Sequence, residues 1–197
     1  MLSFTLPDTK AFDADAKDEV SGIRFADVDN VAKVDTVADL LTHPSSLGEI
    51  RQGVSKHFYS DGAFNLIQLM MYIIKQTGPA HVWLTTYSIS DDSIKVLKQK
   101  VECGDILSIR FLIDNRVRSM SPKNFDLLVG CFPGCYRCRA LHAKVALIYN
   151  DEWAVTLIGS QNATRNPKLE RGIIHTDRTI FEFDKKILTD EFDKGTT

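Results

Sequence analysis

Four polar side chains in the second half of the sequence have the types and spacing needed for chemistry on a phosphate group. His142 and Lys144 stand just before one apolar run, and Ser160 and Asn162 stand just after a second one. An imidazole with an ordinary pKa of roughly 6.5 can attack phosphorus or transfer a proton near neutral pH. The lysine ammonium and the uncharged donors of serine and asparagine can hold the non-bridging oxygens. This set of groups is suited to phosphodiester cleavage without a metal ion.

The two apolar runs, joined through Asn150–Asp151, predict an antiparallel hairpin. Alternate residues of a strand share a face, so His142 and Lys144 are expected to point the same way. Pairing about this turn places His142 opposite Gly159 and beside Ser160, and a bulge would shift the pairing by one residue. Gly159 has no Cβ and permits a close approach of the backbone. The alternative interpretation is a pair of ordinary strands with a polar end.

The sequence HAK at 142–144, followed by GSQN at 159–162, resembles the HxK…GSxN signature of the phospholipase D superfamily. That family often keeps a carboxylate further downstream, where this chain has Glu170. It usually has an aspartate five positions after the lysine. Here Tyr149 occupies that place and Asp151 lies two residues later, so the departure concerns the aspartate and not the His-Lys pair.

The resemblance covers residues 59–177 and implies a mechanism. In the family, two HxK motifs meet across a two-fold axis, where one histidine forms a phosphohistidine and the other protonates the leaving group. The single motif of this chain therefore implies a homodimer with one composite site and no cofactor. By the same resemblance, Lys144 and Asn162 would bind phosphate oxygens, and Glu170 would accept a hydrogen bond from the His142 ring.

Charge is distributed unevenly along the chain, although the net charge is only -2. Residues 1–30 hold seven acidic against three basic residues, whereas residues 110–144 hold seven basic against two acidic residues. A local positive field next to His142 would attract a polyanion, and a solvated basic face is the alternative interpretation. The substrate-binding candidates are four arginines of this basic segment: Arg116, Arg118, Arg137 and Arg139.

These observations favour a nuclease that cleaves DNA or RNA. One alternative is a non-catalytic nucleic-acid-binding module that uses the same phosphate site. Another is a phospholipid phosphodiesterase, which would need a membrane-docking surface, and no membrane segment or amphipathic anchor is evident in the sequence. A third is a zinc-stabilised interaction domain.

The zinc alternative depends on Cys131, Cys135 and Cys138, which could bind a metal if Cys103 supplied a fourth ligand. No second Cys-x2-Cys pair supports it, so free thiols are favoured and no metal is expected. The first 29 residues lack the basic start and continuous apolar core of a signal peptide. Four cysteines without a secretion signal indicate a reducing, cytoplasmic location.

Apolar spacing predicts helices over 31–41, 63–75, 91–101, 122–129 and 179–188, and strands over 80–89, 106–113 and 172–174. Ser60 or Asp61 is expected to cap the second helix and Asp91 or Asp92 the third. The last nine residues are polar and are expected to fray. The element order, with the resemblance, predicts an α/β fold with a mixed, mostly parallel β-sheet flanked by helices. We expect an acidic, partly helical N-terminal extension over 1–58 and a catalytic domain over 59–197.

Overall fold

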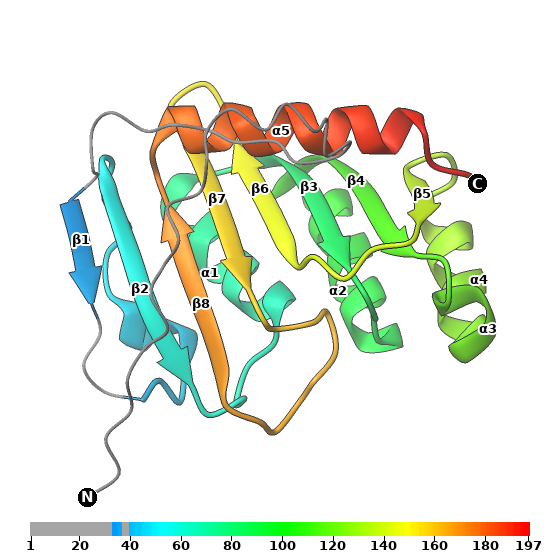
Figure 1. The fold of residues 1–197 in the computed structure, drawn as a ribbon, viewed down its shortest axis with the longest axis horizontal. Coiled ribbons are helices and arrows are strands. Elements are labelled where there is room, and N and C mark those ends of the chain that lie inside the picture. Colours follow the sequence, from blue (N-terminus) through cyan, green and yellow to red (C-terminus); the bar gives the residue numbers. More distant parts are fainter. Residues whose placement is uncertain (1–32, 37–39) are drawn as a thin grey trace, which may run out of the picture.

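An eight-stranded sheet forms the centre of the protein in the computed structural model, which describes residues 33–36 and 40–197. Its strands are β1 (Lys33–Thr36), β2 (Val54–Ser60), β3 (Ala80–Thr86), β4 (Ile106–Asp114), β5 (Tyr136–Arg139), β6 (Val145–Tyr149), β7 (Ala154–Gly159) and β8 (Glu170–His175). They lie in the order β1-β2-β8-β7-β6-β3-β4-β5 (Figure 1). The predicted acidic segment over 1–30 lies outside the described residues.

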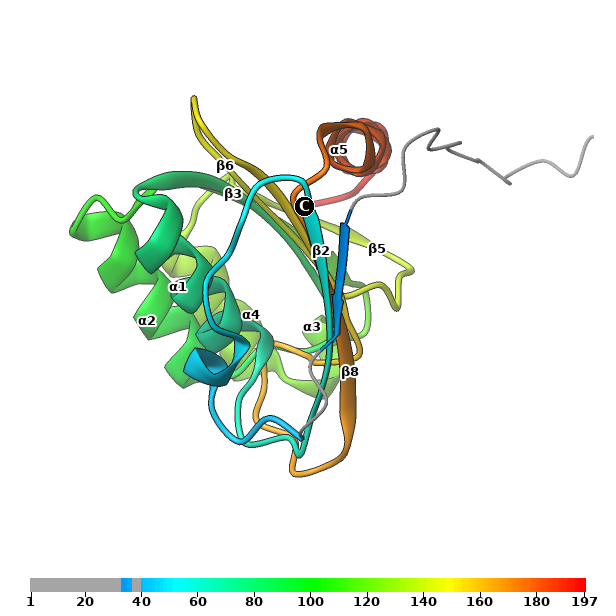
Figure 2. The same ribbon diagram turned by 90° about the vertical axis from the view of Figure 1, so that its left-hand side faces the viewer.

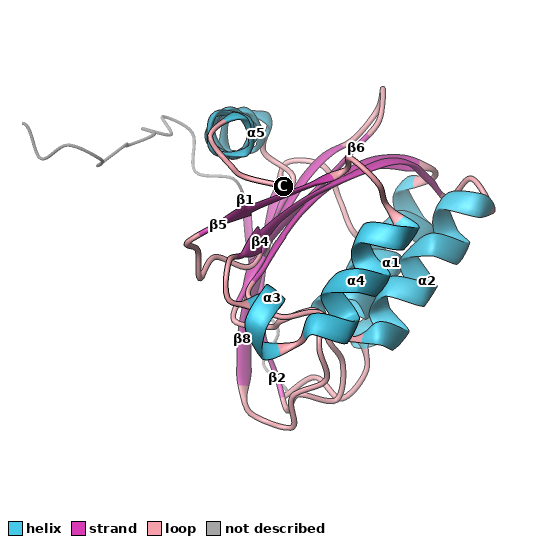
Figure 3. Ribbon diagram, turned by 90° about the vertical axis from the view of Figure 1, so that its right-hand side faces the viewer, coloured by secondary structure: helices cyan, strands magenta, loops and turns pink. Residues whose placement is uncertain are grey.

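Helices cover both faces of the sheet. The helical elements are a short 3-10 helix (Pro44–Leu47), α1 (Leu66–Thr77), α2 (Asp91–Glu102), α3 (Val117–Met120), α4 (Pro122–Cys131) and α5 (Arg178–Asp193). Helices α1, α2 and α4 pack on one face, and α5 crosses the other (Figures 2 and 3). The larger core lies under α1, α2 and α4, and a smaller one around Trp83 and Phe181 lies under α5. Within the described ranges, no helix is long and apolar enough to cross a membrane.

The predicted mixed α/β fold is confirmed, but the expectation of a mostly parallel sheet is wrong. The pairs β1/β2, β3/β4 and β4/β5 are parallel, whereas β2/β8, β8/β7, β7/β6 and β6/β3 are antiparallel. The reason lies in the connections. The strand–helix–strand unit β3-α2-β4 gives parallel neighbours, but a short turn between β6 and β7 can join only antiparallel ones.

The predicted helix over 31–41 is wrong where the structure describes it. Residues 33–36 form β1, which pairs in parallel with β2, while residues 31–32 and 37–39 lie outside the described ranges. Backbone hydrogen bonding to a neighbouring strand overrides the helical spacing of the valines here. Strand β2 spans Val54–Ser60 and therefore crosses the predicted boundary at 58/59. Separate roles for the two segments stay a prediction.

Two predicted helix caps are wrong by a few residues. Ser60 belongs to β2, and α1 begins after Asn65, whose side chain accepts a 3.0 Å hydrogen bond from Gln68 N. The Gln68 side chain accepts one from Asn65 N in return, which completes a capping box. Ser90, rather than Asp91 or the residue after it, caps α2. In both cases a nearby polar residue satisfies the first free N–H groups of the helix.

The C-terminal residues are ordered against the sheet, which contradicts the predicted fraying. Helix α5 continues to Asp193, and Thr196 then forms a two-way bridge with Cys138 of β5. Cys138 N donates to Thr196 O at 2.7 Å, and Thr196 N donates to Cys138 O at 3.1 Å. The preceding Gly195 permits this approach, because a Cβ there would lie 2.6 Å from the Cβ of Arg137.

Helix α5 carries a buried carboxyl group that should make stability depend on pH. Asp184 Oδ2 is buried without a hydrogen-bond partner among the described residues, and burial raises the pKa of this group to about 6. The folded state therefore bears the cost of a buried charge above pH 6, and that cost disappears as the pH falls toward the ordinary value of 3.8.

We expect Asp184→Asn to raise the free energy of unfolding at pH 8 by on the order of 2 kcal/mol. The gain should shrink as the pH falls from 6 to 4, because the wild-type carboxyl group then becomes neutral in the folded state. Chemical denaturation of both proteins between pH 4 and 8 measures the difference. A difference that stays constant over this range would contradict the assignment.

Candidate active site

The predicted catalytic residues meet at one end of the central strands, where β6 and β8 begin and β3, β4 and β7 end (Figure 1). His142 and Lys144 precede β6, Ser160 and Asn162 follow β7, and Glu170 is the first residue of β8. Because β6, β7 and β8 are neighbouring antiparallel strands, these ends must lie side by side. The structure therefore brings together all five residues proposed from the sequence.

The hairpin register differs from the predicted one by two residues. The turn spans Asn150–Trp153 instead of Asn150–Asp151, because the Asn150 side chain accepts a 2.9 Å hydrogen bond from Trp153 N. Lys144, rather than His142, consequently lies opposite Gly159, and Gly159 N donates to Lys144 O at 3.1 Å. A shift by two residues preserves the side-chain faces, so the predicted clustering survives the error.

Gly159 permits the close packing expected of it. A Cβ at this position would collide with the Gln161 side chain and would lie 3.3 Å from Arg171 O on β8. Gln161 is itself 1 % exposed, so its side chain has little room to move away. The glycine thus allows the chain after β7 to turn tightly into the site.

An exposed imidazole and a buried ammonium form the centre of the site. Lys144 Nζ lies 3.1 Å from Nδ1 and 3.2 Å from Nε2 of His142, and it donates to His142 O at 2.8 Å. Lys144 is 6 % exposed, whereas His142 faces solvent. Burial lowers the pKa of the lysine, and the neighbouring Glu170 carboxylate partly opposes this effect. The lysine can therefore hold a fixed position while the histidine stays open to a substrate.

Glu170 has a different set of partners from the one implied by the resemblance. Ser160 Oγ donates a hydrogen bond to Glu170 Oε2, and Asn166 Nδ2 donates to Oε1 at 2.8 Å. Arg171 N also donates to Ser160 Oγ at 3.0 Å. Among the described residues no hydrogen bond joins His142 to Glu170. The carboxylate instead orders the loop between β7 and β8 and supplies negative charge near Lys144.

Asn162 is positioned through its backbone, and its side-chain oxygen has no partner among the described residues. Leu66 N, at the start of α1, donates to Asn162 O at 3.1 Å. The side-chain Oδ1 is buried, and no described residue forms a hydrogen bond with it. Oδ1 is an acceptor, so binding of a phosphate oxygen would have to use the Nδ2 donor, and the oxygen-binding role of Asn162 stays a prediction.

Asp114 and Thr85 hold the segment that carries His142. Asp114 is 2 % exposed, and its Oδ2 accepts a 3.1 Å hydrogen bond from Leu141 N. Thr85 Oγ1 donates to Ala143 O at 3.1 Å and accepts from Val145 N at 2.8 Å. Sequence reasoning counted Asp114 only as a charge. In the sequence, Asp114 is a lone acid at the end of an apolar strand. That position points to a role near His142 only once the order of the strands in the sheet is known.

Tyr87 is a second residue that sequence reasoning missed. The centre of its ring lies 5.3 Å from the centre of the His142 ring and 5.8 Å from Lys144 Nζ. The guanidinium carbon of Arg116 lies 4.6 Å from the same ring, and Asp114 binds this arginine through Nε at 2.8 Å. The Arg116 hydrogen bond lowers the pKa of the Asp114 carboxyl group.

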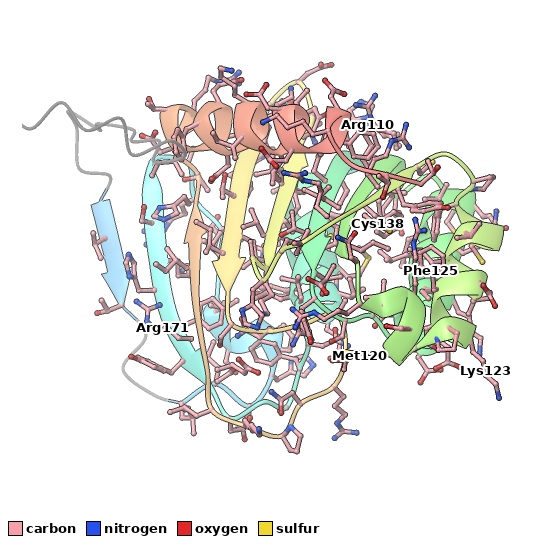
Figure 4. The ribbon with its side chains drawn as sticks, turned by 45° about the vertical axis from the view of Figure 1, so that its right-hand side comes forward. Arg110, Met120, Lys123, Phe125, Cys138 and Arg171 are labelled. Atoms are coloured by element: carbon pink, nitrogen blue, oxygen red, sulfur yellow. The ribbon has the colours of Figure 1, made fainter. Side chains whose placement is uncertain are left out.

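The four predicted substrate-binding arginines differ in their surroundings. Only Arg116 is connected to His142, through Tyr87. Arg118 stacks on Phe125 at 5.0 Å and donates to Cys138 Sγ at 3.5 Å, and these two partners lie on the same side of the molecule (Figure 4). The other two lie on β5. Arg137 stacks on Phe192 of α5 at 4.7 Å, and Arg139 pairs with Glu191 at 2.6 Å.

The cysteines do not form a metal site in the described part of the chain, where no three His, Cys, Asp or Glu side chains converge to hold a metal ion. Cys103 is exposed at the end of α2, whereas Cys138 is buried in β5. In the part of the chain that the structure describes, no fourth ligand joins the three cysteines between 131 and 138.

The chain matches no protein-family model and no curated protein. Among solved structures, it is similar to a polyphosphate kinase from Porphyromonas gingivalis, with a TM-score of 0.51 and 16% identity over 73% of this chain and 26% of that one. It therefore spans about a quarter of that protein. A weaker likeness, with a TM-score of 0.46, links it to TrmBL2, an archaeal chromatin protein, at 11% identity over 76% and 55% of the two chains. NucT from Helicobacter pylori has the same TM-score, at 17% identity over 72% and 97%. The likeness to the kinase shows that the two proteins share a fold over this part of the chain.

Proposed function

We propose that the protein is a metal-independent phosphodiesterase that cleaves nucleic acid through a phosphohistidine intermediate on His142. The observation that carries the proposal is the solvent-facing imidazole with the Lys144 ammonium 3.1 Å away. A nucleophile and a buried cation so placed can act on the same phosphate. The fold supports the proposal, because it is shared with a protein named for its action on polyphosphate.

In the proposed reaction, one ring nitrogen of His142 attacks phosphorus and displaces the leaving oxygen. Lys144 Nζ and the Nδ2 donor of Asn162 hold the non-bridging oxygens, and these donors offset the charge that develops in the transition state. Water then attacks the phosphohistidine, which releases the second product and regenerates the imidazole. The leaving oxygen needs a proton in the first step, and the attacking water must lose one in the second.

No other histidine of this chain can supply that proton. Each of the remaining four makes its own contact away from His142: His43 with Ser45, His57 with Arg171, His81 with Ser108, and His175 with Ser55. A two-fold axis through the site would bring in the partner subunit's His142, as the single motif implies. The active species in this proposal is therefore a homodimer with a composite site.

We expect hydrolysis of single-stranded DNA or RNA to persist in excess EDTA. The groups at the site are imidazole, ammonium and amide, and both oxygens of Glu170 are already engaged by Ser160 and Asn166. Magnesium prefers several free oxygen ligands, and these residues do not offer them. The assay compares labelled DNA, labelled RNA and phospholipid vesicles, each with EDTA and with added Mg²⁺.

Three other outcomes would contradict the proposal in distinct ways. Activity that is lost in EDTA and recovered with Mg²⁺ would show a metal-dependent mechanism. Salt-sensitive binding without turnover would indicate a non-catalytic nucleic-acid-binding module. Hydrolysis of the vesicles alone would identify a lipid phosphodiesterase.

A further inference from the structure

Arg116 is held beside the site in a way that the other arginines of the basic segment are not. Its backbone N donates to Asp114 Oδ1 at 2.9 Å, its Nε donates to the same oxygen at 2.8 Å, and its Nη2 donates to Oδ2 at 3.4 Å. The acid is 2 % exposed, whereas the arginine side chain is 58 % exposed. A buried carboxylate thus anchors one side of the guanidinium and leaves the other side in solvent.

Tyr87 fixes the plane of this guanidinium. The guanidinium carbon of Arg116 lies 4.6 Å from the Tyr87 ring centre, close enough for a cation–π contact. The Tyr87 hydroxyl is directed to Met120 Sδ, 3.6 Å away at the end of α3. Because ring and carboxylate hold the arginine together, little side-chain entropy is left to lose when a ligand binds.

The outward donors of Arg116 have no partner within residues 33–36 and 40–197. The bonds to Asp114 use Nε and Nη2, and Nη1 donates to no described residue. Asp114 offsets the positive charge, so the attraction for an anion comes mainly from directed N–H groups. Such donors suit a phosphate, whose oxygens accept two parallel hydrogen bonds.

The same carboxylate also connects Arg116 to the catalytic segment, because Asp114 Oδ2 accepts a hydrogen bond from Leu141 N. Tyr87 contacts both Arg116 and His142, and its ring centre lies 5.3 Å from the His142 ring centre. The separation of guanidinium and imidazole is therefore less than the sum of the two stacking distances. Along each strand of a B-DNA duplex, phosphates repeat about every 3.4 Å of helix axis. A neighbouring phosphate of the same strand can reach Arg116 while His142 attacks the scissile one.

We propose that Arg116, positioned by Asp114 and Tyr87, is a second phosphate subsite that binds a phosphate within about three nucleotides of the scissile one. This inference rests on the proposed function and adds a substrate class to it. The preferred substrate is a chain of phosphodiesters, and an isolated phosphodiester is bound weakly. Asp114 and Tyr87 are positioning residues in this arrangement, because they act through Arg116.

The test removes charge from the substrate and from the protein in turn. One short oligonucleotide carries phosphodiesters throughout, and a second carries one phosphodiester among uncharged methylphosphonate linkages. We expect wild type to show a kcat/KM at least about tenfold higher for the first, as a charged hydrogen bond allows. Arg116→Gln should reduce this ratio to a few-fold. Arg178→Gln on α5, which removes the same charge far from the site, should leave the ratio unchanged.

Arg116→Gln leaves the buried carboxylate of Asp114 without its cation, which could destabilise the fold. A second variant controls for this effect. The double variant Asp114→Asn/Arg116→Gln removes that charge and keeps an acceptor for Leu141 N. Dissociation constants of the two oligonucleotides for the His142→Ala protein, with and without Arg116→Gln, give a readout that does not need turnover.

The outcomes separate the subsite from the catalytic proposal. Discrimination that depends on Arg116 in binding, without hydrolysis by wild type, would retain the subsite and reject the nuclease. Hydrolysis with discrimination unchanged in both Arg116 variants would reject the subsite and retain the nuclease. Equal use of the two oligonucleotides by wild type would also overturn the subsite.

Discussion

Replacing His142 with alanine is expected to lower kcat by at least about 10³-fold, because the variant lacks the proposed nucleophile. The fold should be unaffected, since the ring is exposed and the side-chain contacts described for it are with Lys144 and Tyr87. Steady-state hydrolysis of a labelled oligonucleotide gives the rate, and thermal unfolding checks the fold. Denaturation at alkaline pH during turnover, where the P–N bond of a phosphohistidine is stable, should trap labelled phosphate on the wild-type protein and none on the variant.

His81→Ala is a suitable control for this experiment. His81 lies on β3, and its Nδ1 is 2.8 Å from Ser108 Oγ, away from the proposed site. The control should hydrolyse the oligonucleotide at nearly the wild-type rate. Comparable turnover by purified His142→Ala would mean that this histidine is not the nucleophile.

Mixing wild-type and His142→Ala subunits should reduce activity as the square of the wild-type fraction. A composite site needs one imidazole to attack and another to protonate the leaving oxygen, so a mixed dimer lacks one of the two groups. A protein that works as a monomer would instead lose activity in direct proportion to the fraction of variant subunits. The two subunits are unfolded together, refolded at fixed total concentration and assayed across the full range of ratios.

Electrostatics predicts that substrate strengthens this dimer. Two Lys144 ammonium groups would face one another across the axis, and the two Glu170 carboxylates offset only part of their repulsion. A bound phosphate supplies further negative charge, so the dissociation constant of the dimer should fall when an oligonucleotide binds. Sedimentation velocity with the His142→Ala protein, with and without the oligonucleotide, measures this. A fully active monomer at assay concentration would defeat the dimer proposal.

The clustering of the candidate site residues could be predicted from the sequence because its geometry is local. Two residues separated by one position on a strand share a face, and a hairpin brings the ends of its strands together whatever the exact turn. The register was wrong because the Asn150 side chain extends the turn to Trp153. A shift of two residues leaves each side chain on the same face of the sheet, so His142 and Lys144 are still in contact.

Asp114 and Tyr87 could not be found in this way, because they reach the site through contacts between distant parts of the chain. Tyr87 follows β3 and Asp114 ends β4, so their approach to His142 depends on the parallel pairing of β3 with β4 and on β6 lying beside β3. Glu170 shows a similar difficulty. Ser160 and Asn166 each bind one of its two oxygens in place of His142, and sequence spacing does not reveal these partners.

Helices α1, α2 and α4 could be predicted from apolar spacing, because the apolar residues of a helix that packs on a sheet recur with the helical period. Helix α1, for instance, was predicted over 63–75 and spans Leu66–Thr77. Strand β1 could not be predicted, since four residues carry little periodicity and their structure comes from pairing with β2. The direction of the strands after β5 likewise depends on short connections and not on strand composition.

The bridge between Thr196 and Cys138 covers part of β5, an edge strand of the sheet, and so hinders pairing with a strand of another molecule. An edge strand offers free N–H and C=O groups, which can recruit a strand of another molecule and start aggregation. In this protein Thr196 occupies these groups at Cys138, and the arginines on either side of Cys138 place charge along the same strand. Loss of the Thr196 bridge would expose this edge, so we expect it to increase aggregation even though Thr196 lies away from the proposed chemistry.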